Sequence, residues 1–163
     1  MNRSTHRDPA EDNWLYRFFY RDWRPTRLGR YLNRFWGWWS GLGLPPRRQA
    51  TLETRGRVSG RTRATPVVIV SLDGARYLVA MLGPHTEWVR NAEAAQGQAV
   101  IRQGRRRPVR LLPVAVEQRA PVLREYVRAA PGGRRHFPVA LGAPLSAFEG
   151  IAGRYPVFRI DPA

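Results

Sequence analysis

The residue types best suited to chemistry gather in one short stretch, residues 52–66, which reads LETRGRVSGRTRATP. It holds four arginines, two glycines and a serine at the positions Arg55, Gly56, Arg57, Ser59, Gly60, Arg61 and Arg63. Guanidinium groups bind phosphate and carboxylate oxygens through paired hydrogen bonds. Glycines accept positive φ, so they let a loop point its N–H groups at one anion. The stretch therefore predicts an anion-binding loop, although its composition alone also fits a solvated basic hairpin turn.

The rest of the chain offers little other reactive chemistry. It has no cysteine among its 163 residues, which excludes disulfides, thiolate metal sites and cysteine nucleophiles. Its three histidines, His6, His85 and His136, show no metal-ligand spacing, so no metal is expected. All 28 basic residues are arginine and the formal charge is +16, which predicts attraction to nucleic acid, anionic lipid or a phosphorylated small molecule. Nucleic acid is disfavoured, because the basic run at residues 102–110 lacks interleaved aromatics that could stack on bases.

Strand-like segments flank the loop and continue through the rest of the chain. Strands are expected at residues 50–54, 64–72, 75–82, 98–103, 107–116 and 155–160. Helices are expected at residues 87–96, between Thr86 as N-cap and Gly97, and at residues 120–130 and 144–152. About six strands with short helices between them predict an α+β, mostly β fold, a small antiparallel barrel decorated with helices.

The hairpin formed by residues 64–82 turns at Asp73-Gly74 and is apolar at nearly every position. Both faces of its strands should therefore be buried. One face would fill the barrel, and the other needs a helix, the N-terminal segment or a partner subunit as its cover. We expect a homodimer, because the chain is short for covering both faces by itself.

Residues 14–39 differ in composition and hold five of the six tryptophans. Pro25 suits the first turn of a helix, and a shorter helix capped by Asp12 or Asn13 is expected before it. One face of the helix after Pro25 carries Leu28, Tyr31, Leu32, Phe35, Trp36 and Trp39. An aromatic face opposite arginines suits an anionic membrane surface, and it equally suits packing on the barrel or on a second subunit.

The connector SGLGLPP at residues 40–46 divides the chain into an N-terminal helical segment, residues 1–46, and a barrel domain, residues 47–163. The first residues lack the apolar stretch of a signal peptide. No apolar run reaches the length needed to span a bilayer. These features predict a cytoplasmic protein, either free or peripheral on the inner face of the cell membrane.

Residues 52–95 resemble the deazaflavin-dependent nitroreductase family, a group of split β-barrel oxidoreductases. The resemblance covers the glycine and arginine loop, the hairpin after it and the helical motif W-x-x-N, and extends loosely to residues 155–160. It implies a split β-barrel fold and the 8-hydroxy-5-deazaflavin coenzyme F420 as cofactor, with FMN as the alternative. It also implies that the loop holds the coenzyme's phosphate and its polyglutamate tail.

The resemblance assigns cofactor-binding roles residue by residue. Around the phosphate and the tail it places Arg55, Gly56, Arg57, Ser59, Gly60, Arg61, Arg63, Thr65 and Pro66. Along the deazaflavin ring it places Ala80, Met81, Leu82 and Gly83, with Trp88 and Asn91 next to the ring. Many relatives carry a polar segment where this chain has Met81 and Leu82, and the loop before Trp88 is shorter here. The ring pocket is therefore altered, or it holds another flavin or an apolar ligand.

These features predict an oxidoreductase that transfers a hydride from the reduced coenzyme to a small electrophilic acceptor, such as a quinone, an enone or a nitroaromatic. Tyr126 and His136 are candidate proton donors, although a core tyrosine and a surface histidine are the commoner roles for such residues. The alternative function is a non-catalytic, membrane-associated binding protein for a fatty acid, a flavin or another apolar ligand.

Overall fold

The computed structural model describes residues 20–21, 24–25 and 48–163. The chain divides into two compact units, residues 1–42 and residues 43–163. The predicted boundary between residues 46 and 47 falls close to this division. That the two parts are separate domains stays a prediction.

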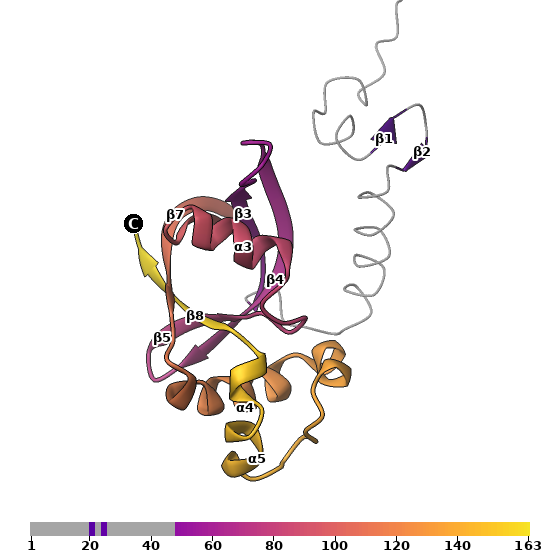
Figure 1. The fold of residues 1–163 in the computed structure, drawn as a ribbon, viewed down its shortest axis with the longest axis vertical. Helices are drawn as coiled ribbons and strands as arrows, with labels where there is room; N and C mark the ends of the chain where they lie inside the picture. Colours follow the sequence, from indigo (N-terminus) through magenta and orange to yellow (C-terminus); the bar gives the residue numbers. More distant parts are fainter. Residues whose placement is uncertain (1–19, 22–23, 26–47) are drawn as a thin grey trace, which may run out of the picture. The chain divides into compact units, whose positions relative to one another are not determined.

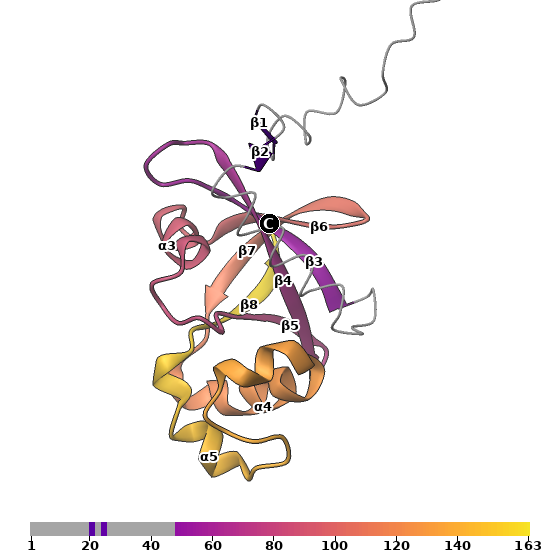
Figure 2. The same cartoon turned by 90° about the vertical axis from the view of Figure 1, so that its right-hand side faces the viewer.

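The second unit is a closed barrel of six antiparallel strands (Figures 1 and 2). The strands are β3 (Gln49–Arg55), β4 (Thr62–Leu72), β5 (Ala75–Val79), β6 (Gln98–Gln103), β7 (Arg105–Pro113) and β8 (Val157–Pro162). Around the barrel they follow the order β3-β4-β5-β8-β7-β6, and β6 closes the ring by pairing with β3. The barrel confirms the fold class that the sequence predicts.

Short helical segments connect the strands. They are α3 (Glu87–Ala94), η2 (Val116–Gln118), α4 (Arg119–Ala129), η3 (Pro131–His136), α5 (Leu145–Glu149) and η4 (Ala152–Arg154). The last predicted helix is shorter than expected, because the chain continues after α5 as the separate 3-10 turn η4. The hairpin turn is as predicted, since Asp73 and Gly74 have φ of 50° and 75°. Two consecutive positive φ angles are the mark of a two-residue hairpin turn that matches the twist of its strands.

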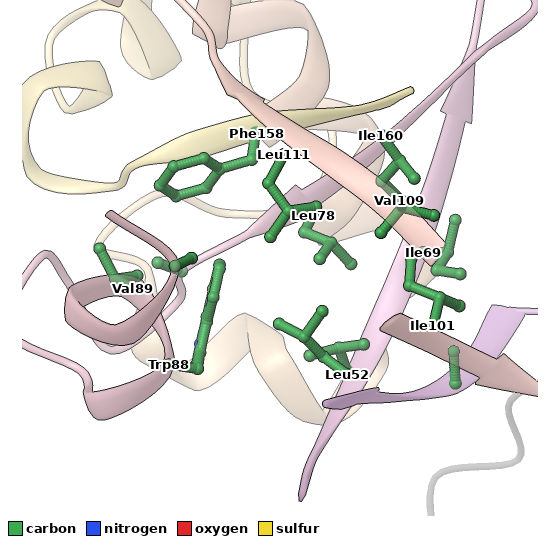
Figure 3. Packing of buried hydrophobic residues seen from close by; sticks show 14 residues of the cluster. Leu52, Ile69, Leu78, Trp88, Val89, Ile101, Val109, Leu111, Phe158 and Ile160 are labelled. Atoms are coloured by element: carbon green, nitrogen blue, oxygen red, sulfur yellow. The ribbon is translucent and has the colours of Figure 1, made fainter. Parts of the chain in front are cut away.

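Side chains from all six strands fill the barrel interior (Figure 3). Along β3, Ala50 and Leu52 are buried while their neighbours are not, as expected for a strand with alternate residues facing inward. Trp88 and Val89 of α3 belong to the same buried cluster. The helix is therefore held against the barrel by its own apolar side chains.

The middle of β4 is buried on both faces, from Pro66 to Val70 without a break. Val67 and Ile69 belong to the barrel core, and α4 packs against β4 and β5. The prediction of two buried faces is confirmed for this strand, and its cover is a helix of the same unit. This observation removes the reason for which the sequence favours a homodimer, because no second subunit is needed to bury β4.

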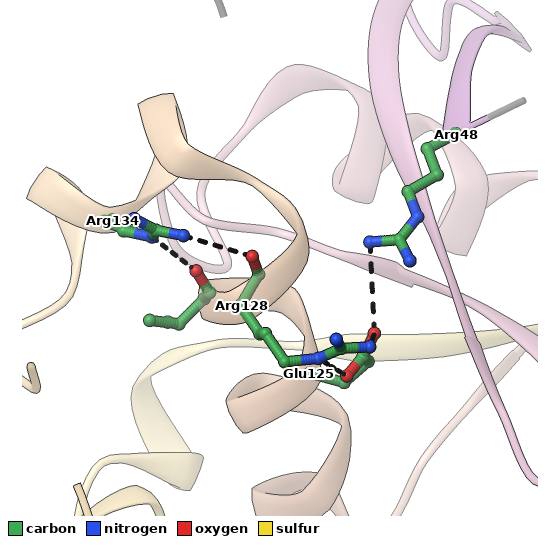
Figure 4. Close-up of polar contacts among 5 residues, drawn as sticks. Arg48, Glu125, Arg128 and Arg134 are labelled. Carbon is green, nitrogen blue, oxygen red and sulfur yellow. Dashed lines mark hydrogen bonds and ion pairs between the residues drawn. The ribbon is translucent and has the colours of Figure 1, made fainter. Parts of the chain in front are cut away.

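Polar contacts fasten α4 at its C-terminal end (Figure 4). The guanidinium of Arg134 donates to the carbonyl oxygens of Val127 at 2.7 Å and of Arg128 at 3.1 Å. It thereby satisfies carbonyl groups that have no partner within the helix. Glu125 accepts from Arg128 at 2.6 and 2.7 Å and lies 4.0 Å from Arg48.

In the first unit, Tyr20–Arg21 (β1) pairs antiparallel with Arg24–Pro25 (β2). Pro25 therefore lies in a two-residue strand. The sequence prediction that it lies in the first turn of a helix is wrong. A proline is tolerated there because a strand at the edge of a sheet needs no hydrogen bond from its outer N–H. The whole aromatic face that the sequence predicts, from Leu28 to Trp39, lies outside the described residues. Among the residues that the structure describes, no helix combines the length and the apolar composition needed to cross a membrane.

Candidate functional site

The arginine loop, residues 56–61, joins β3 to β4 and has a compact backbone. The Gly56 N–H donates to the Arg61 carbonyl and the Gly60 N–H to the Gly56 carbonyl, both at 2.8 Å. Gly60 has a φ of 65°, so the predicted need for a positive φ is confirmed at this position. It is wrong for Gly56, which does not have a positive φ. Gly56 meets a packing constraint instead, because a Cβ there would lie 3.0 Å from both the Arg61 carbonyl oxygen and the Ser59 hydroxyl oxygen.

The backbone N–H groups of this loop do not converge on an open anion site. The Arg57 N–H donates to Asn91 Oδ1 at 3.2 Å, and the Arg61 N–H lies 3.4 Å from the Ser59 hydroxyl oxygen. With Gly56 and Gly60, four of the loop's N–H groups are used inside the protein. Recognition of an anion therefore depends on the arginine side chains.

Arg57 ties the loop to α3. Its guanidinium donates to Glu87 at 2.8 and 3.3 Å and to Asn91 Oδ1 at 3.2 Å. The hydrogen bond to Arg57 is the main cause that holds the pKa of Glu87 below its usual range, and the same bond raises the pKa of Arg57. The two side chains are thus charged partners, which we call the Arg57–Glu87 latch. The sequence prediction did not include Glu87, although it lies one turn before Asn91 on α3 and so shares that residue's face.

The two residues of the W-x-x-N motif are buried beneath the loop. Asn91 is 2% exposed, and its side-chain oxygen is shared between the backbone and the side chain of Arg57. Trp88 is 7% exposed and packs edge-on against Phe158, with ring centroids 5.4 Å apart. Both residues therefore position the loop and α3 and offer little surface to a ligand. Thr86 precedes α3 as predicted, but its hydroxyl donates to the Gly83 carbonyl at 3.1 Å and does not cap the helix.

Residues 80–83 leave the barrel as a turn, so the strand that was predicted to continue to Leu82 ends at Val79. The Ala80 N–H donates to the Pro156 carbonyl and the Gly83 N–H to the Ala80 carbonyl, both at 2.9 Å. Gly83 has a φ of 87°, which closes the turn. Within residues 48–163, the N–H groups of Met81 and Leu82 make no hydrogen bond, and the Leu82 side chain is 48% exposed. The turn therefore presents two N–H donors beside an apolar surface.

The two candidate proton donors have different surroundings. Tyr126 is buried, and its hydroxyl donates to the Met81 sulfur at 3.1 Å. Burial raises the pKa of Tyr126, because a phenolate would be poorly solvated. His136 is half-buried in η3. Its burial is the main cause that lowers its pKa, and the positive charge of Arg135 lowers the pKa further. The structure thus brings Tyr126 to the turn at residues 80–83, where it supports Met81.

At the arginine loop and the strand ends next to it, three arginine side chains remain available for an anion. The guanidinium groups of Arg55, Arg61 and Arg63 are exposed and form no hydrogen bond or ion pair within residues 48–163. Thr65 is half-buried on β4 and Pro66 is buried. The accessible part of the β3–β4 hairpin is therefore its loop and the strand ends next to it. These free cations fit a coenzyme with a phosphate and several carboxylates. The turn with unpaired N–H groups and the exposed Leu82 fits a flat ring with polar edges.

Comparison with solved structures agrees with this fold. The chain is similar to the protein Atu2129, of unknown function, from Agrobacterium tumefaciens strain C58, with 18% identity and a TM-score of 0.51 over 71% of this chain. It spans about half, 48%, of the length of that protein. The chain is also similar to the F420-H2 dependent reductase FDR-A, with 20% identity and a TM-score of 0.49 over 74% of this chain and 100% of that one. A search of curated proteins found no match.

The closed six-stranded barrel is the fold expected of the split-barrel reductases that the sequence resembles. The family model described as F420H(2)-dependent quinone reductase matches residues 32–138, and the chain belongs to this family. The description of this family names an F420-dependent reductase, which makes coenzyme F420 the cofactor of the family.

Proposed function

We propose that the protein transfers a hydride from reduced coenzyme F420 to a quinone, an enone or a nitroaromatic. The observation that carries the proposal is a set of three unpaired guanidinium groups: that of Arg61 on a loop locked to α3, and those of Arg55 and Arg63 on the strands that lead into and out of that loop. A locked loop holds its cations in place before the ligand arrives, so less conformational entropy is lost on binding. The family match to residues 32–138 supports the choice of this coenzyme over FMN.

When bound, the reduced coenzyme supplies the hydride, so the protein must bind and orient it and leave room for the acceptor. Arg55, Arg61 and Arg63 would bind the phosphate and the carboxylates. The N–H groups of Met81 and Leu82 would hold the polar edge of the ring, because they are not used elsewhere in the described barrel. The exposed side chain of Leu82 would pack against the ring.

The acceptor gains negative charge as the hydride arrives, and cations or N–H groups near it would stabilise that charge. We assign the proton that follows to solvent and not to Tyr126. The Tyr126 hydroxyl is buried, already donates to Met81, and has its pKa raised by burial, all of which oppose proton release. Tyr126 is therefore proposed as the residue that positions Met81.

The acceptor class can be tested by following oxidation of the reduced coenzyme in the presence of menadione, cyclohexenone or a nitroimidazole. We expect turnover with at least one of them to exceed the rate without protein. The variants Arg61→Gln and Arg63→Gln should raise the KM for the coenzyme more than they lower kcat, because these side chains act in binding. No acceleration with any acceptor, by protein that binds the coenzyme, would contradict the proposed reaction.

Two further proposals concern the protein's surroundings. We propose that the aromatic segment at residues 14–39 associates with anionic membrane surfaces, on the strength of its sequence pattern. We also retain the homodimer as a proposal, although α4 covers the face of β4 that motivated it. A quinone acceptor would suit a membrane-associated enzyme, because many quinones dissolve in the bilayer.

A further inference from the structure

A cavity of about 340 Å³, which we call the α4 cavity, lies between the end of β4, the helix α4 and the chain on either side of α5's start. Its volume is near the lower limit of small-molecule sites, which span about 300–1,000 Å³. Its described lining contains no residue assigned to the coenzyme. In Figures 1 and 2, α4 and α5 lie at the opposite end of the barrel unit from the β3–β4 loop. The apolar side chains of the lining are Leu72, Pro121, Val127, Leu141 and Phe148.

The cavity marks the edge of the apolar layer between β4 and the helices that cover it. Val127 and Phe148 are 0% exposed and form its floor, because α4 packs against β4 and α5 packs against α4. Leu72, at the end of β4, and Pro121, in the first turn of α4, are half-buried. A ligand would therefore touch the half-buried rim and would rest above the floor.

The outer wall of the cavity is an exposed leucine on a fixed turn. The Ala143 N–H donates to the Ala140 carbonyl at 3.2 Å, and Gly142 has a φ of 87°. A glycine with positive φ at this position is typical of a type II turn. The turn holds Leu141 with 54% of its surface exposed. An occupant of the cavity would bury apolar surface that the described chain leaves in water, which stabilises binding.

The charged side chains of the described lining leave one cation unpaired. They are Arg124, Glu125 and Arg128. Glu125 accepts from Arg128 at 2.6 and 2.7 Å and lies 4.0 Å from Arg48 (Figure 4). The Arg124 guanidinium is exposed and forms no hydrogen bond or ion pair within residues 48–163. The cavity is therefore complementary to a single anionic group beside an apolar body.

The surroundings favour a ligand with one negative charge. Asp73 follows Leu72 and Glu149 follows Phe148 in the sequence, and neither belongs to the described lining. These nearby acids would disfavour a phosphate ester, which carries almost two negative charges at neutral pH. A carboxylate carries one charge and matches the guanidinium fork. A ring system suits the apolar part, because a rigid body loses less conformational entropy on binding than a flexible chain does.

We propose that the α4 cavity binds a small aromatic or cyclic carboxylate. Its carboxylate pairs with Arg124, and its ring packs between Leu72 and Leu141. The site goes beyond the proposed function, since it shares no residue with the coenzyme site and takes a different class of ligand.

The probe is cinnamate, titrated into full-length protein and followed by backbone NMR, which reports both affinity and location. Cinnamyl alcohol has the same ring without the charge, and acetate has the charge without the ring. We expect cinnamate to bind about fivefold more tightly than the alcohol, the size expected of an ion pair at an exposed site. Acetate should not bind at the same concentrations. Cinnamate should shift resonances of Leu72, Leu141 and α4, and shifts confined to the arginine loop would overturn the proposal.

Two variants separate the charged contact from the apolar one. Arg124→Gln should weaken cinnamate binding by about fivefold and leave binding of the alcohol unchanged. Leu141→Ser should weaken binding of both molecules, because both lose the same apolar contact. Both side chains are exposed, so the fold should be retained. Cinnamate affinity that is unchanged in both variants would overturn the proposal.

The matched controls are Arg107→Gln on β7 and Val116→Ser in η2, which alter exposed side chains outside the described lining. Neither should change cinnamate binding. A loss in Arg107→Gln equal to that in Arg124→Gln would overturn the proposal, because the attraction would then come from the overall positive charge.

A second titration, with saturating coenzyme F420, tests whether the two sites are separate. Cinnamate affinity should be unchanged, and competition would place cinnamate in the coenzyme site and overturn the proposal. If the protein binds no deazaflavin, the proposed function fails, while the cinnamate titration and the Arg124→Gln variant still decide on the α4 cavity.

Discussion

Arg57 and Arg61 lie four residues apart on one loop, yet their side chains have different partners. The Arg57 guanidinium is bound to Glu87 and Asn91 of α3. The Arg61 guanidinium has no partner within residues 48–163. Two arginines of the same loop therefore have different roles. Arg57 holds the loop in place, and Arg61 is open to a ligand.

We predict that Arg61→Ala weakens coenzyme binding by at least about tenfold, because it removes a direct charge-assisted contact. Arg57→Ala should also weaken binding, but through a loosened loop, so its effect should be reproduced by Glu87→Gln, which breaks the same latch. Fluorescence titration of the purified variants measures both effects. If Glu87→Gln binds the coenzyme as the unmodified protein does while Arg57→Ala does not, Arg57 contacts the coenzyme directly and the latch is not its role.

The latch should also depend on pH. The pKa of Glu87 in the folded protein lies below its ordinary value, so the ion pair is fully formed above the ordinary pKa of a glutamate. It is lost as the pH falls through the lowered value. The side-chain Nε resonance of Arg57, followed by NMR during acidification, should shift in that acidic range. The shift should be absent in Glu87→Gln, and a shift that persists in this variant would assign the titration to another group.

At the residue scale, the sequence predicted the composition of the site better than the role of each member. The structure brings the arginine loop and the turn at residues 80–83 close to α3, which carries the W-x-x-N motif. Arg57 contacts Asn91, and Thr86 contacts Gly83. The latch was missed because it joins residues 30 positions apart. Spacing along a chain shows which face of a helix a residue shares, and it does not show which distant loop meets that face.

Two glycines in the connections between elements have the same backbone conformation but different surroundings. Gly97, after α3, has a φ of 81°, and a Cβ there would lie 2.4 Å from the Leu111 carbonyl oxygen. Gly104, in the β6–β7 turn, has a φ of 73° with nothing near its would-be Cβ. The two positions share the backbone conformation and differ in crowding, which makes them a matched pair.

We predict that Gly97→Ala destabilises the protein more than Gly104→Ala does. The strain of a positive φ applies to both and amounts to roughly 1–2 kcal/mol. Gly97→Ala must in addition push α3 away from β7, because the clashing atom is backbone and cannot rotate aside. Urea unfolding of both variants measures the difference in unfolding free energy. Equal destabilisation would show that the α3–β7 contact yields easily.

At the element scale, the strands were predictable because β-branched runs and a two-residue turn fix them locally. The element that covers the outer face of β4 was not predictable. An apolar outer face shows that something must cover it, but it does not show which element does so. The structure assigns it to α4, which lies far along the chain from β4. The end of β5 was missed for a similar reason, because residues 80–82 are apolar like a strand but belong to a turn held by Pro156.

For the whole molecule, we predict that the protein binds anionic vesicles through residues 14–39. Burial of aromatic rings in the interface stabilises binding at roughly 25 cal/mol per Å² of apolar area. Each arginine near an anionic surface adds about 1 kcal/mol. Full-length protein should therefore co-sediment with anionic vesicles, less so in high salt, while a variant beginning at Pro46 should stay largely in solution. Equal binding by both would assign the affinity to arginines of the barrel.

The assembly state is a separate prediction for the whole molecule. A homodimer should give twice the monomer mass by light scattering at micromolar concentration. The monomer mass is 18.7 kDa, so the two outcomes are easily distinguished. A monomeric mass would agree with the cover of β4 by α4 and would reject the dimer.

The measurement that tests the account most directly is titration of the purified protein with coenzyme F420, followed by its fluorescence, beside parallel titrations with FMN and a long-chain fatty acid. The unpaired guanidinium groups of Arg55, Arg61 and Arg63 predict saturable binding of the coenzyme that is at least tenfold tighter than binding of FMN, because FMN lacks the additional carboxylates. Replacing the three arginines with glutamine should remove that preference while the fold is retained. Binding of FMN or the fatty acid in preference to the coenzyme would contradict the account.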